Sequence, residues 1–270
     1  DLAKTFRLIA ENGSIVLYRG EIAQAILQAQ FRTRAGARGV GRMTLDDLDQ
    51  YDVKIRRPIA GNYRGFTVHS MPPPSSGGLT IIQILKMLER FHLGDTSQGF
   101  GFGATKTLHV MIEALRLGFA DRAVWMGDED FVPVPKVGLV ADPYVAIRGA
   151  MIQQASRMPT PLAGDPWPFD GAGAPPLVPM APPPPQEEGG HTTHFSVLDR
   201  WGNLVSYTTT IEAIWGSGIV VPGYGFLLNN ELTDFNFTPQ RNPATGNPGA
   251  NDVAPFKRPR SSMSPSILLK

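Results

Sequence analysis

The residues best suited to chemistry lie in one short stretch, from Gly189 to Asp199. Two glycines are followed by His191 and Thr192, and the residues after them read as a strand. A threonine that becomes the first residue of a chain after backbone cleavage carries both a nucleophile, its hydroxyl, and a base, its new α-amine. Such an amine has a pKa of roughly 7.7–8.0, so a useful fraction is neutral at ordinary pH. The stretch therefore predicts a chain that cuts itself and uses a threonine as nucleophile.

Hairpin geometry is expected to bring a second hydroxyl beside the first. Residues 193–198 and 204–211 read as strands on either side of a turn around Trp201. If they pair about Trp201 without a bulge, Thr210 lies directly across from Thr192. His194 is expected to be a packed or hydrogen-bonded strand residue rather than a general base, because the α-amine already fills that role.

The composition sets outer limits on function. The chain has 270 residues, of which 42% are hydrophobic and 18% charged, as in ordinary soluble globular proteins. A net charge of +1 gives no indication of a nucleic-acid or anionic membrane partner. No apolar run approaches the roughly 18 residues that span a bilayer. The absence of cysteine excludes thiolate chemistry, and the five histidines show no metal-ligand spacing, so no cofactor is predicted.

The elements around this stretch follow from apolar spacing and turn residues. Helices are predicted over residues 1–11, 21–34, 44–51, 79–91, 105–124 and 142–157. Further strands are predicted over 63–70, 225–228 and from 266 onwards, the last two of them buried. The proline-rich run from Met158 to Pro185 is not expected to build a core and reads as a linker. The acidic residues after Gly127 are expected to form a solvated loop rather than a calcium site, since the EF-hand spacing is absent.

Six motifs, taken together and in order, resemble those of the γ-glutamyltranspeptidases, or glutathione hydrolases. They are Met71–Gly78, Phe119–Arg122, Gly127-Asp128, Thr192–Ser196, Asn229–Glu231 with Asp234-Phe235, and Arg258-Pro259 with Ser261–Pro265. The resemblance implies an α+β fold, the four-layer αββα sandwich of the N-terminal nucleophile hydrolases. That sandwich is expected to be incomplete at both ends, because residue 1 starts directly in a helical pattern and residue 270 ends inside a strand.

The same resemblance implies two subunits cut from one precursor. Residues 1–191 would be the C-terminal part of the large (α) subunit, helix-rich with a proline-rich tail over 158–191. Residues 192–270 would be the strand-rich N-terminal part of the small (β) subunit. The cut falls between His191 and Thr192, with Thr192 as nucleophile and Thr210 as a second threonine that hydrogen-bonds it. The mature enzyme would take a γ-glutamyl group from glutathione and pass it to water or to an amino acid or peptide.

Substrate-binding roles also carry over from the resemblance. Glu231 and Asp234 would hold the α-ammonium of the donor, and Ser261 and Ser262 would donate to its α-carboxylate. Glu212 stands where well-known members carry asparagine. Read without the family, the carboxylates are exposed turn residues and the serines are capping hydroxyls.

Some elements of complete members lie outside these residues. An arginine that clamps the donor carboxylate would lie before residue 1, and the oxyanion-hole glycines after residue 270. The loop over residues 236–256 lacks the tyrosine that some members place over the site. Family members are commonly periplasmic, secreted or surface-anchored.

Two other functions remain open from the sequence. The family also contains acylases for the glutaryl side chains of β-lactams, which have no ammonium to bind. A chain that neither cleaves itself nor turns over is the other alternative, and an intact band in a denaturing gel would identify it. The carboxylates Glu212, Glu231 and Asp234 favour the γ-glutamyl enzyme, since a cationic ammonium needs anionic partners.

Overall fold

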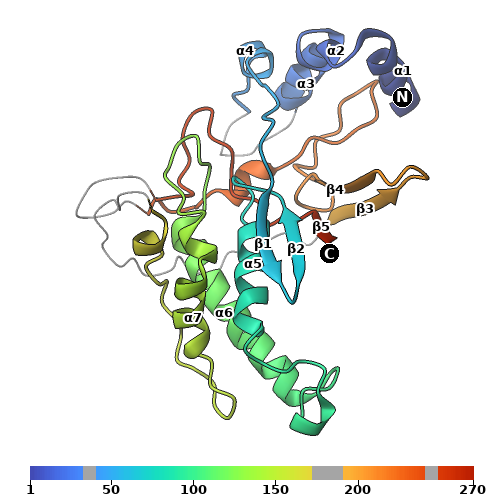
Figure 1. The fold of residues 1–270 in the computed structure, drawn as a ribbon. Coiled ribbons are helices and arrows are strands. Elements are labelled where there is room, and N and C mark those ends of the chain that lie inside the picture. Colours follow the sequence, from blue (N-terminus) through green and yellow to red (C-terminus); the bar gives the residue numbers. More distant parts are fainter. Residues whose placement is uncertain (33–40, 172–190, 241–248) are drawn as a thin grey trace. The chain divides into compact units, whose positions relative to one another are not determined.

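The computed structural model describes residues 1–32, 41–171, 191–240 and 249–270 (Figure 1). Several predicted segments lie partly outside the described residues. They are the second half of the linker 158–185, the glycines at 189 and 190, the last two residues of the helix 21–34 and part of the loop 236–256. The chain divides into two compact units. The first consists of residues 1–56, 188–193 and 209–231, and the second of residues 57–187, 194–208 and 232–270.

The described part of the first unit contains four helices, three of them predicted. They are α1 (Leu2–Asn12), α2 (Ile15–Tyr18), α3 (Glu21–Arg32) and α4 (Leu45–Asp49). Gly13 ends α1 with a φ of 71°, a conformation that glycine adopts at little cost. Thr44 begins α4 through a reciprocal capping box with Asp47. The short helix α2 was not predicted, because four residues carry no helical period.

The core of this unit joins α3 to the segment around Val221 and Tyr224. Its buried residues are Val16, Ile22, Ile26, Ala29, Val221 and Tyr224. The predicted buried strand over 225–228 is wrong: only an isolated bridge joins Val220 and Leu227, and none of the four residues is buried. Gly223 and Gly225 both have positive φ, so the chain turns here instead of extending.

The second unit contains a three-stranded antiparallel sheet with the order β1-β2-β5. Its strands are β1 (Ile59–Tyr63), β2 (Phe66–Ser70) and β5 (Ser266–Leu269). The predicted strand 63–70 is therefore the second half of a hairpin, which turns at Arg64 and Gly65, both with positive φ. The predicted burial of the last strand is wrong for Leu268 and Leu269, which are 53% and 47% exposed.

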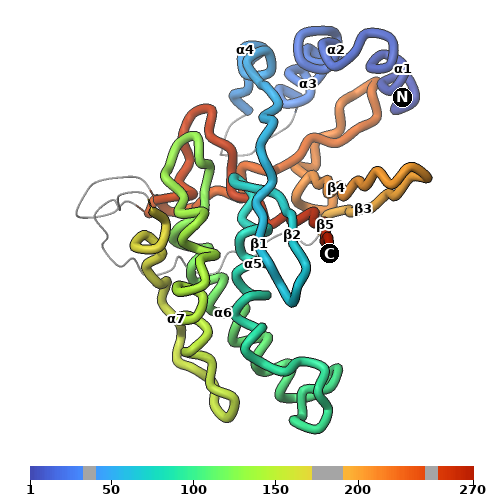
Figure 2. Tube along the Cα trace, in the orientation of Figure 1, coloured from blue at the N-terminus to red at the C-terminus, as the bar shows by residue number. Residues whose placement is uncertain are grey.

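Of the three helices described in this unit, one packs on the sheet and on the other two. The three are α5 (Gly77–Leu88), α6 (Thr105–Trp125) and α7 (Asp142–Ala150), with 3₁₀ turns at Thr96–Gln98, Gly138–Val140 and Trp167–Phe169. Helix α5 lies against β1 and β2 and also against α6 and α7 (Figure 2). The predicted α5 and α6 are confirmed to within three residues at each end, whereas α7 ends at Ala150 rather than Arg157.

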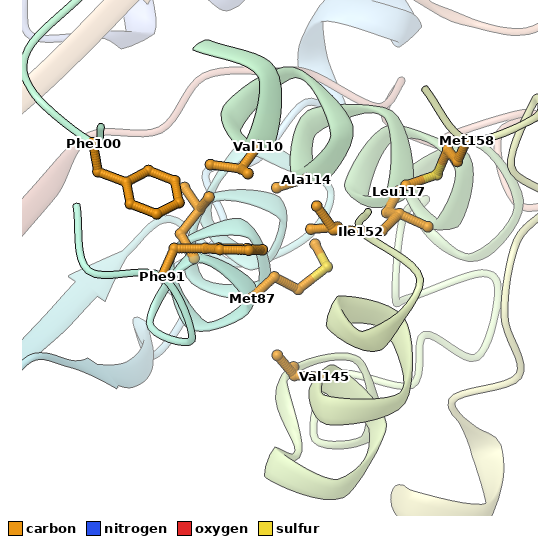
Figure 3. Close-up of a cluster of buried hydrophobic side chains, with 10 residues drawn as sticks. Met87, Phe91, Phe100, Val110, Ala114, Leu117, Val145, Ile152 and Met158 are labelled. Carbon is orange, nitrogen blue, oxygen red and sulfur yellow. The ribbon is translucent and has the colours of Figure 1, made fainter. Parts of the chain in front are cut away.

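The main hydrophobic cluster lies between α5, α6 and α7 (Figure 3). It includes Met158, and Trp167 is also buried, so the prediction that the run from Met158 builds no core is wrong for its first part. Arg116 donates to the carbonyls of Met158 and Pro159 at 3.0 Å, and the first of these bonds satisfies a backbone group of a buried residue. A segment outside any helix or sheet can therefore be buried here, because a side chain supplies the hydrogen bond that its backbone lacks.

The predicted α+β class is confirmed by these helices and antiparallel sheets. The packing of α5 on β1 and β2 provides one helix-on-sheet contact of the kind that a layered αββα sandwich requires.

Candidate active site

The stretch around Thr192 forms a β-hairpin. Strand β3 (Thr192–Leu198) pairs with strand β4 (Leu204–Thr210). Asp199 closes the turn: its backbone N–H donates to the Asn203 carbonyl at 3.0 Å, and its carboxylate accepts from the N–H groups of Trp201 and Asn203 at 2.9 and 2.8 Å. The Asn203 side chain and the surrounding N–H groups lower the pKa of Asp199. An ionised carboxylate therefore fixes the turn.

Contacts further along give the register of the hairpin. His194 Nδ1 lies 2.7 Å from Thr208 Oγ1, so these two residues face each other. Together with the turn bond from Asp199, this contact confirms the predicted centre at Trp201. If no bulge interrupts the strands, the same alignment continued to the end of the hairpin would place Thr210 across from Thr192, as predicted. His194 is confirmed as a hydrogen-bonded strand residue.

The segment after β4 is tied back to the residues before Glu231. Glu212 has a φ of 71°, in the left-handed region that few non-glycine residues adopt. Its N–H donates to Thr210 Oγ1 at 2.8 Å, and its carboxylate accepts from Asn230 Nδ2. The Ala213 N–H donates to Asn230 Oδ1 at 2.9 Å. Because Thr210 Oγ1 is an acceptor in its bond to Glu212, the threonine proton is directed to another group.

Glu231 and Asp234 occupy the two ends of a 3₁₀ turn (Glu231–Asp234). Side chains three residues apart in such a turn project to the same side. The Asp234 carbonyl accepts from Asn251 Nδ2 at 2.6 Å, and Asn251 Oδ1 accepts from the Arg260 N–H at 2.9 Å. Asn251, which is 1% exposed, therefore links the Asp234 segment to the residues just before Ser261.

The serine pair is held by the loop before α5 and by α6. The N–H and the Oγ of Ser76 both donate to the Ser261 carbonyl at 2.8 Å. Arg122 Nη2 donates to Ser262 Oγ at 2.6 Å. A Cβ on Gly77 would lie 2.4 Å from the Ser262 carbonyl, so the close approach requires glycine. Ser261 is half-buried and Ser262 is exposed.

The acidic segment after α6 supports the same region. Asp128 is fully buried, so the prediction of a solvated loop is wrong for this residue. Its Oδ2 accepts from the Arg258 N–H at 2.9 Å. A Cβ on Gly127 would lie 1.9 Å from the Ala250 carbonyl. Because this buried carboxylate accepts backbone N–H groups, the motif fixes the geometry of the chain here.

Two further observations concern metal ions and membranes. In the part of the chain that the structure describes, no three His, Asp or Glu side chains are grouped so that they could bind a metal ion. Among the helices of the described ranges, none is both long and apolar enough to cross a bilayer.

The predicted site residues thus fall into two groups. Thr192, Thr210, Glu212 and Glu231 belong to the first unit, and Asp234, Ser261 and Ser262 belong to the second. Sequence reasoning missed Arg122, Ser76 and Asn251 as partners of these residues. Two of them had one signal in the sequence: Ser76 lies in the motif Met71–Gly78 and Arg122 in the motif Phe119–Arg122.

Comparisons with known proteins cover the whole chain. The sequence profile described as Gamma-glutamyltranspeptidase matches residues 1–270. Over its full length the chain is 42% identical to the glutathione hydrolase proenzyme of Bacillus subtilis (strain 168), covering 43% of that protein. It is 39% identical to the proenzyme of the same name from Escherichia coli (strain K12), covering 42%. It is also 36% identical to the Acylase ACY 1 proenzyme of Pseudomonas sp. (strain SE83), again covering 42%.

Solved structures give a matching fold. The cephalosporin acylase from Bacillus halodurans superposes with a TM-score of 0.73 at 26% identity, over 100% of this chain and 41% of that one. The γ-glutamyltranspeptidase of Helicobacter pylori gives 0.52 at 38% identity, over 58% and 42%. These likenesses confirm the predicted fold of the N-terminal nucleophile hydrolases. The chain spans less than half the length of the relatives that it matches.

Proposed function

The chain belongs to the γ-glutamyltranspeptidase family, and from this premise we propose that the complete protein is a γ-glutamyltransferase and glutathione hydrolase. The observation that carries the proposal is Thr192 as the first residue of β3. The contact between His194 and Thr208 supports the predicted alignment, in which Thr210 lies across from Thr192. The names of the relatives, glutathione hydrolase proenzymes, supply the substrate and the precursor.

The first reaction is cleavage of the chain's own backbone. Thr192 Oγ1 attacks the carbonyl carbon of His191, the peptide C–N bond breaks, and the Thr192 nitrogen takes the hydroxyl proton to become an amine. Water then opens the ester, leaving a carboxylate on His191 and a free hydroxyl on Thr192. Residues 1–191 become the C-terminal part of the large subunit, and residues 192–270 the N-terminal part of the small subunit.

Turnover uses the same hydroxyl. Thr192 Oγ1 attacks the γ-carbonyl of the donor while its α-amine accepts the proton, and the released amine takes that proton. Thr210, whose oxygen accepts from the Glu212 N–H, donates its own proton toward Thr192 Oγ1. Water or the amine of an amino acid or peptide then attacks the acyl-enzyme and releases the γ-glutamyl group.

Donor recognition is assigned to the two groups of polar residues. The carboxylates of Glu231 and Asp234 bind the α-ammonium, because a cation is stabilised by anionic acceptors. The hydroxyls of Ser261 and Ser262 donate to the α-carboxylate. Glu212 adds a further negative charge near the ammonium end.

A glutaryl acylase is the second candidate, and the similarity to Acylase ACY 1 and to the cephalosporin acylase favours it. A glutaryl group has the carboxylate but no ammonium. The number of carboxylates in the candidate site therefore supports the γ-glutamyl donor over the glutaryl one. Rates on γ-glutamyl-p-nitroanilide and glutaryl-p-nitroanilide distinguish the two functions.

The test is a denaturing gel with N-terminal sequencing of the purified complete gene product. We expect two fragments, the smaller of which begins at Thr192, together with release of p-nitroaniline from the γ-glutamyl donor. Thr192→Ala should stay intact and inactive, whereas the matched variant Thr192→Ser, which keeps a hydroxyl, should still be cut. Cleavage of Thr192→Ala at the same bond contradicts the mechanism, and an intact, inactive wild type supports a non-catalytic chain.

A further inference from the structure

Arg122 reaches from a buried position on α6 to the serine pair. Arg122 is 6% exposed. Its Nε donates to Ser76 Oγ at 2.7 Å, and its Nη2 donates to Ser262 Oγ at 2.6 Å. Ser76, fully buried, passes the contact on by donating from Oγ to the Ser261 carbonyl at 2.8 Å. The guanidinium fork therefore fixes the Ser262 hydroxyl directly, whereas the Ser261 carbonyl is held by the N–H of Ser76 as well as by its Oγ.

The direction of these bonds determines what Ser262 can do. Arginine has only donors, so Ser262 Oγ is the acceptor and its single hydroxyl proton is directed away from Arg122. Because hydrogen bonds in a chain polarise one another, a charged donor on the oxygen makes the O–H of Ser262 a better donor. An exposed hydroxyl that is fixed and polarised in this way suits an anionic ligand group.

The acidic residue that precedes Arg122 in the sequence is paired with another arginine. Asp121 precedes Arg122 on α6, is fully buried, and forms an ion pair with Arg148 Nη2 at 2.8 Å. Arg122 donates hydrogen bonds to the Ser76 and Ser262 hydroxyls.

We propose that Arg122 is a positioning residue for the α-carboxylate of the donor, and that it acts through Ser262. The inference rests on the proposed function, which assigns the carboxylate to Ser261 and Ser262. Arg122 thereby contributes to the selection of donors that carry a carboxylate at this end. It takes no part in bond making or breaking, so its effect is on ground-state and transition-state binding alike.

The test compares steady-state kinetics of the complete protein on γ-glutamyl-p-nitroanilide. Arg122→Lys keeps the charge but loses the fork, and we expect KM to rise on the order of 10-fold with kcat changed by less than about threefold. Arg122→Gln should raise KM by roughly 10- to 100-fold. The matched control is Arg116→Gln on the same helix, where Arg116 bonds Glu113 and the Met158 and Pro159 carbonyls. Its KM should stay at the wild-type value.

A double variant separates positioning from a general loss of folding. If Arg122 acts through Ser262, adding Arg122→Lys to Ser262→Ala should change KM by less than twofold, or about 0.4 kcal/mol. Additive effects, a fall in kcat with unchanged KM, or an equal rise of KM in Arg116→Gln would overturn the inference. Should Arg122→Gln fail to fold, Arg122→Lys and the double variant still decide. A wild type that releases no p-nitroaniline refutes the proposed function itself, and the inference with it.

Discussion

Asp121 is the residue whose replacement should damage the fold most. It is 0% exposed, and its carboxylate accepts from Gln83 Nε2 at 2.6 Å, from the Tyr144 hydroxyl at 2.8 Å and from the Gly164 N–H at 2.9 Å, besides its ion pair with Arg148. Burial, together with the negative charge of Asp121, raises the pKa of Tyr144. The tyrosine therefore stays a neutral donor. Each of these four groups donates a hydrogen bond to the Asp121 carboxylate.

The perturbation is Asp121→Asn, which keeps the shape and removes the charge. Arg148 is 4% exposed, so its guanidinium loses its counter-charge without gaining water. Removing one partner of a buried ion pair costs about 3–5 kcal/mol. The asparagine amide also turns one acceptor into a donor that faces other donors, which adds to the loss. For a urea m-value of up to about 3 kcal/mol/M, the unfolding midpoint should fall by about 1 M or more.

The assay is urea unfolding of the complete protein, followed by tryptophan fluorescence. Asp142→Asn is the matched control, because its carboxylate pairs with Lys86 Nζ at 2.6 Å but its side chain is 88% exposed. Lys86 is largely buried but keeps its bond to the Val140 carbonyl at 2.5 Å, and the carboxylate faces water. Because pairs open to water contribute little, the midpoint of this variant should stay close to that of the wild type. If Asp121→Asn lowers the midpoint no further than Asp142→Asn does, the buried ion pair of Asp121 and Arg148 does not contribute the expected stability of about 3–5 kcal/mol.

Two other predictions concern the donor site and acid stability. Asp234→Ala should raise the donor KM with little change in kcat, because it removes an anion from the proposed ammonium site; an unchanged KM refutes that role. Burial alone would raise the pKa of Glu113, but the bonds from the Met158 N–H and from Arg116 lower it overall. Its contribution to stability is therefore complete above its ordinary value of 4.5 and is lost as the pH falls through the lower, folded value. Glu113→Gln should accordingly lose less stability than the wild type between about pH 5 and about pH 3 in urea unfolding, and an equal loss would contradict this assignment.

The elements with a local signal could be predicted from the sequence. Helices α5 and α6 carry long apolar periods, α4 has its capping box, and the β3–β4 hairpin has a turn centred on Trp201. The sheet β1-β2-β5 could not be predicted in full, since the pairing of Val68 with Leu268 joins distant parts of the chain. The burial of Met158 was missed for a similar reason, because it depends on backbone bonds from a side chain on α6.

The same distinction applies to the candidate site. Thr192 and Thr210 could be paired from hairpin geometry, which involves only neighbouring residues. The contact between Arg122 and Ser262 joins residues 140 positions apart, and no periodicity or turn rule relates them. The link from Asn251 to Asp234 crosses a shorter loop but is equally invisible to local patterns. Residue types at a site can thus be read from sequence more readily than the residues that hold them.

The proposed cleavage at His191–Thr192 gives these long-range contacts a further role. Ser261 and Ser262 would belong to the small subunit, whereas Ser76 and Arg122, which hold them, would belong to the large one. Strand β5 likewise follows the cut and pairs with β2, which precedes it. The carboxylate end of the donor site would therefore be built from both pieces. Cleavage can leave such a site intact only if the chain folds before it is cut, because the contacts that position the serines would otherwise have to form between separate chains.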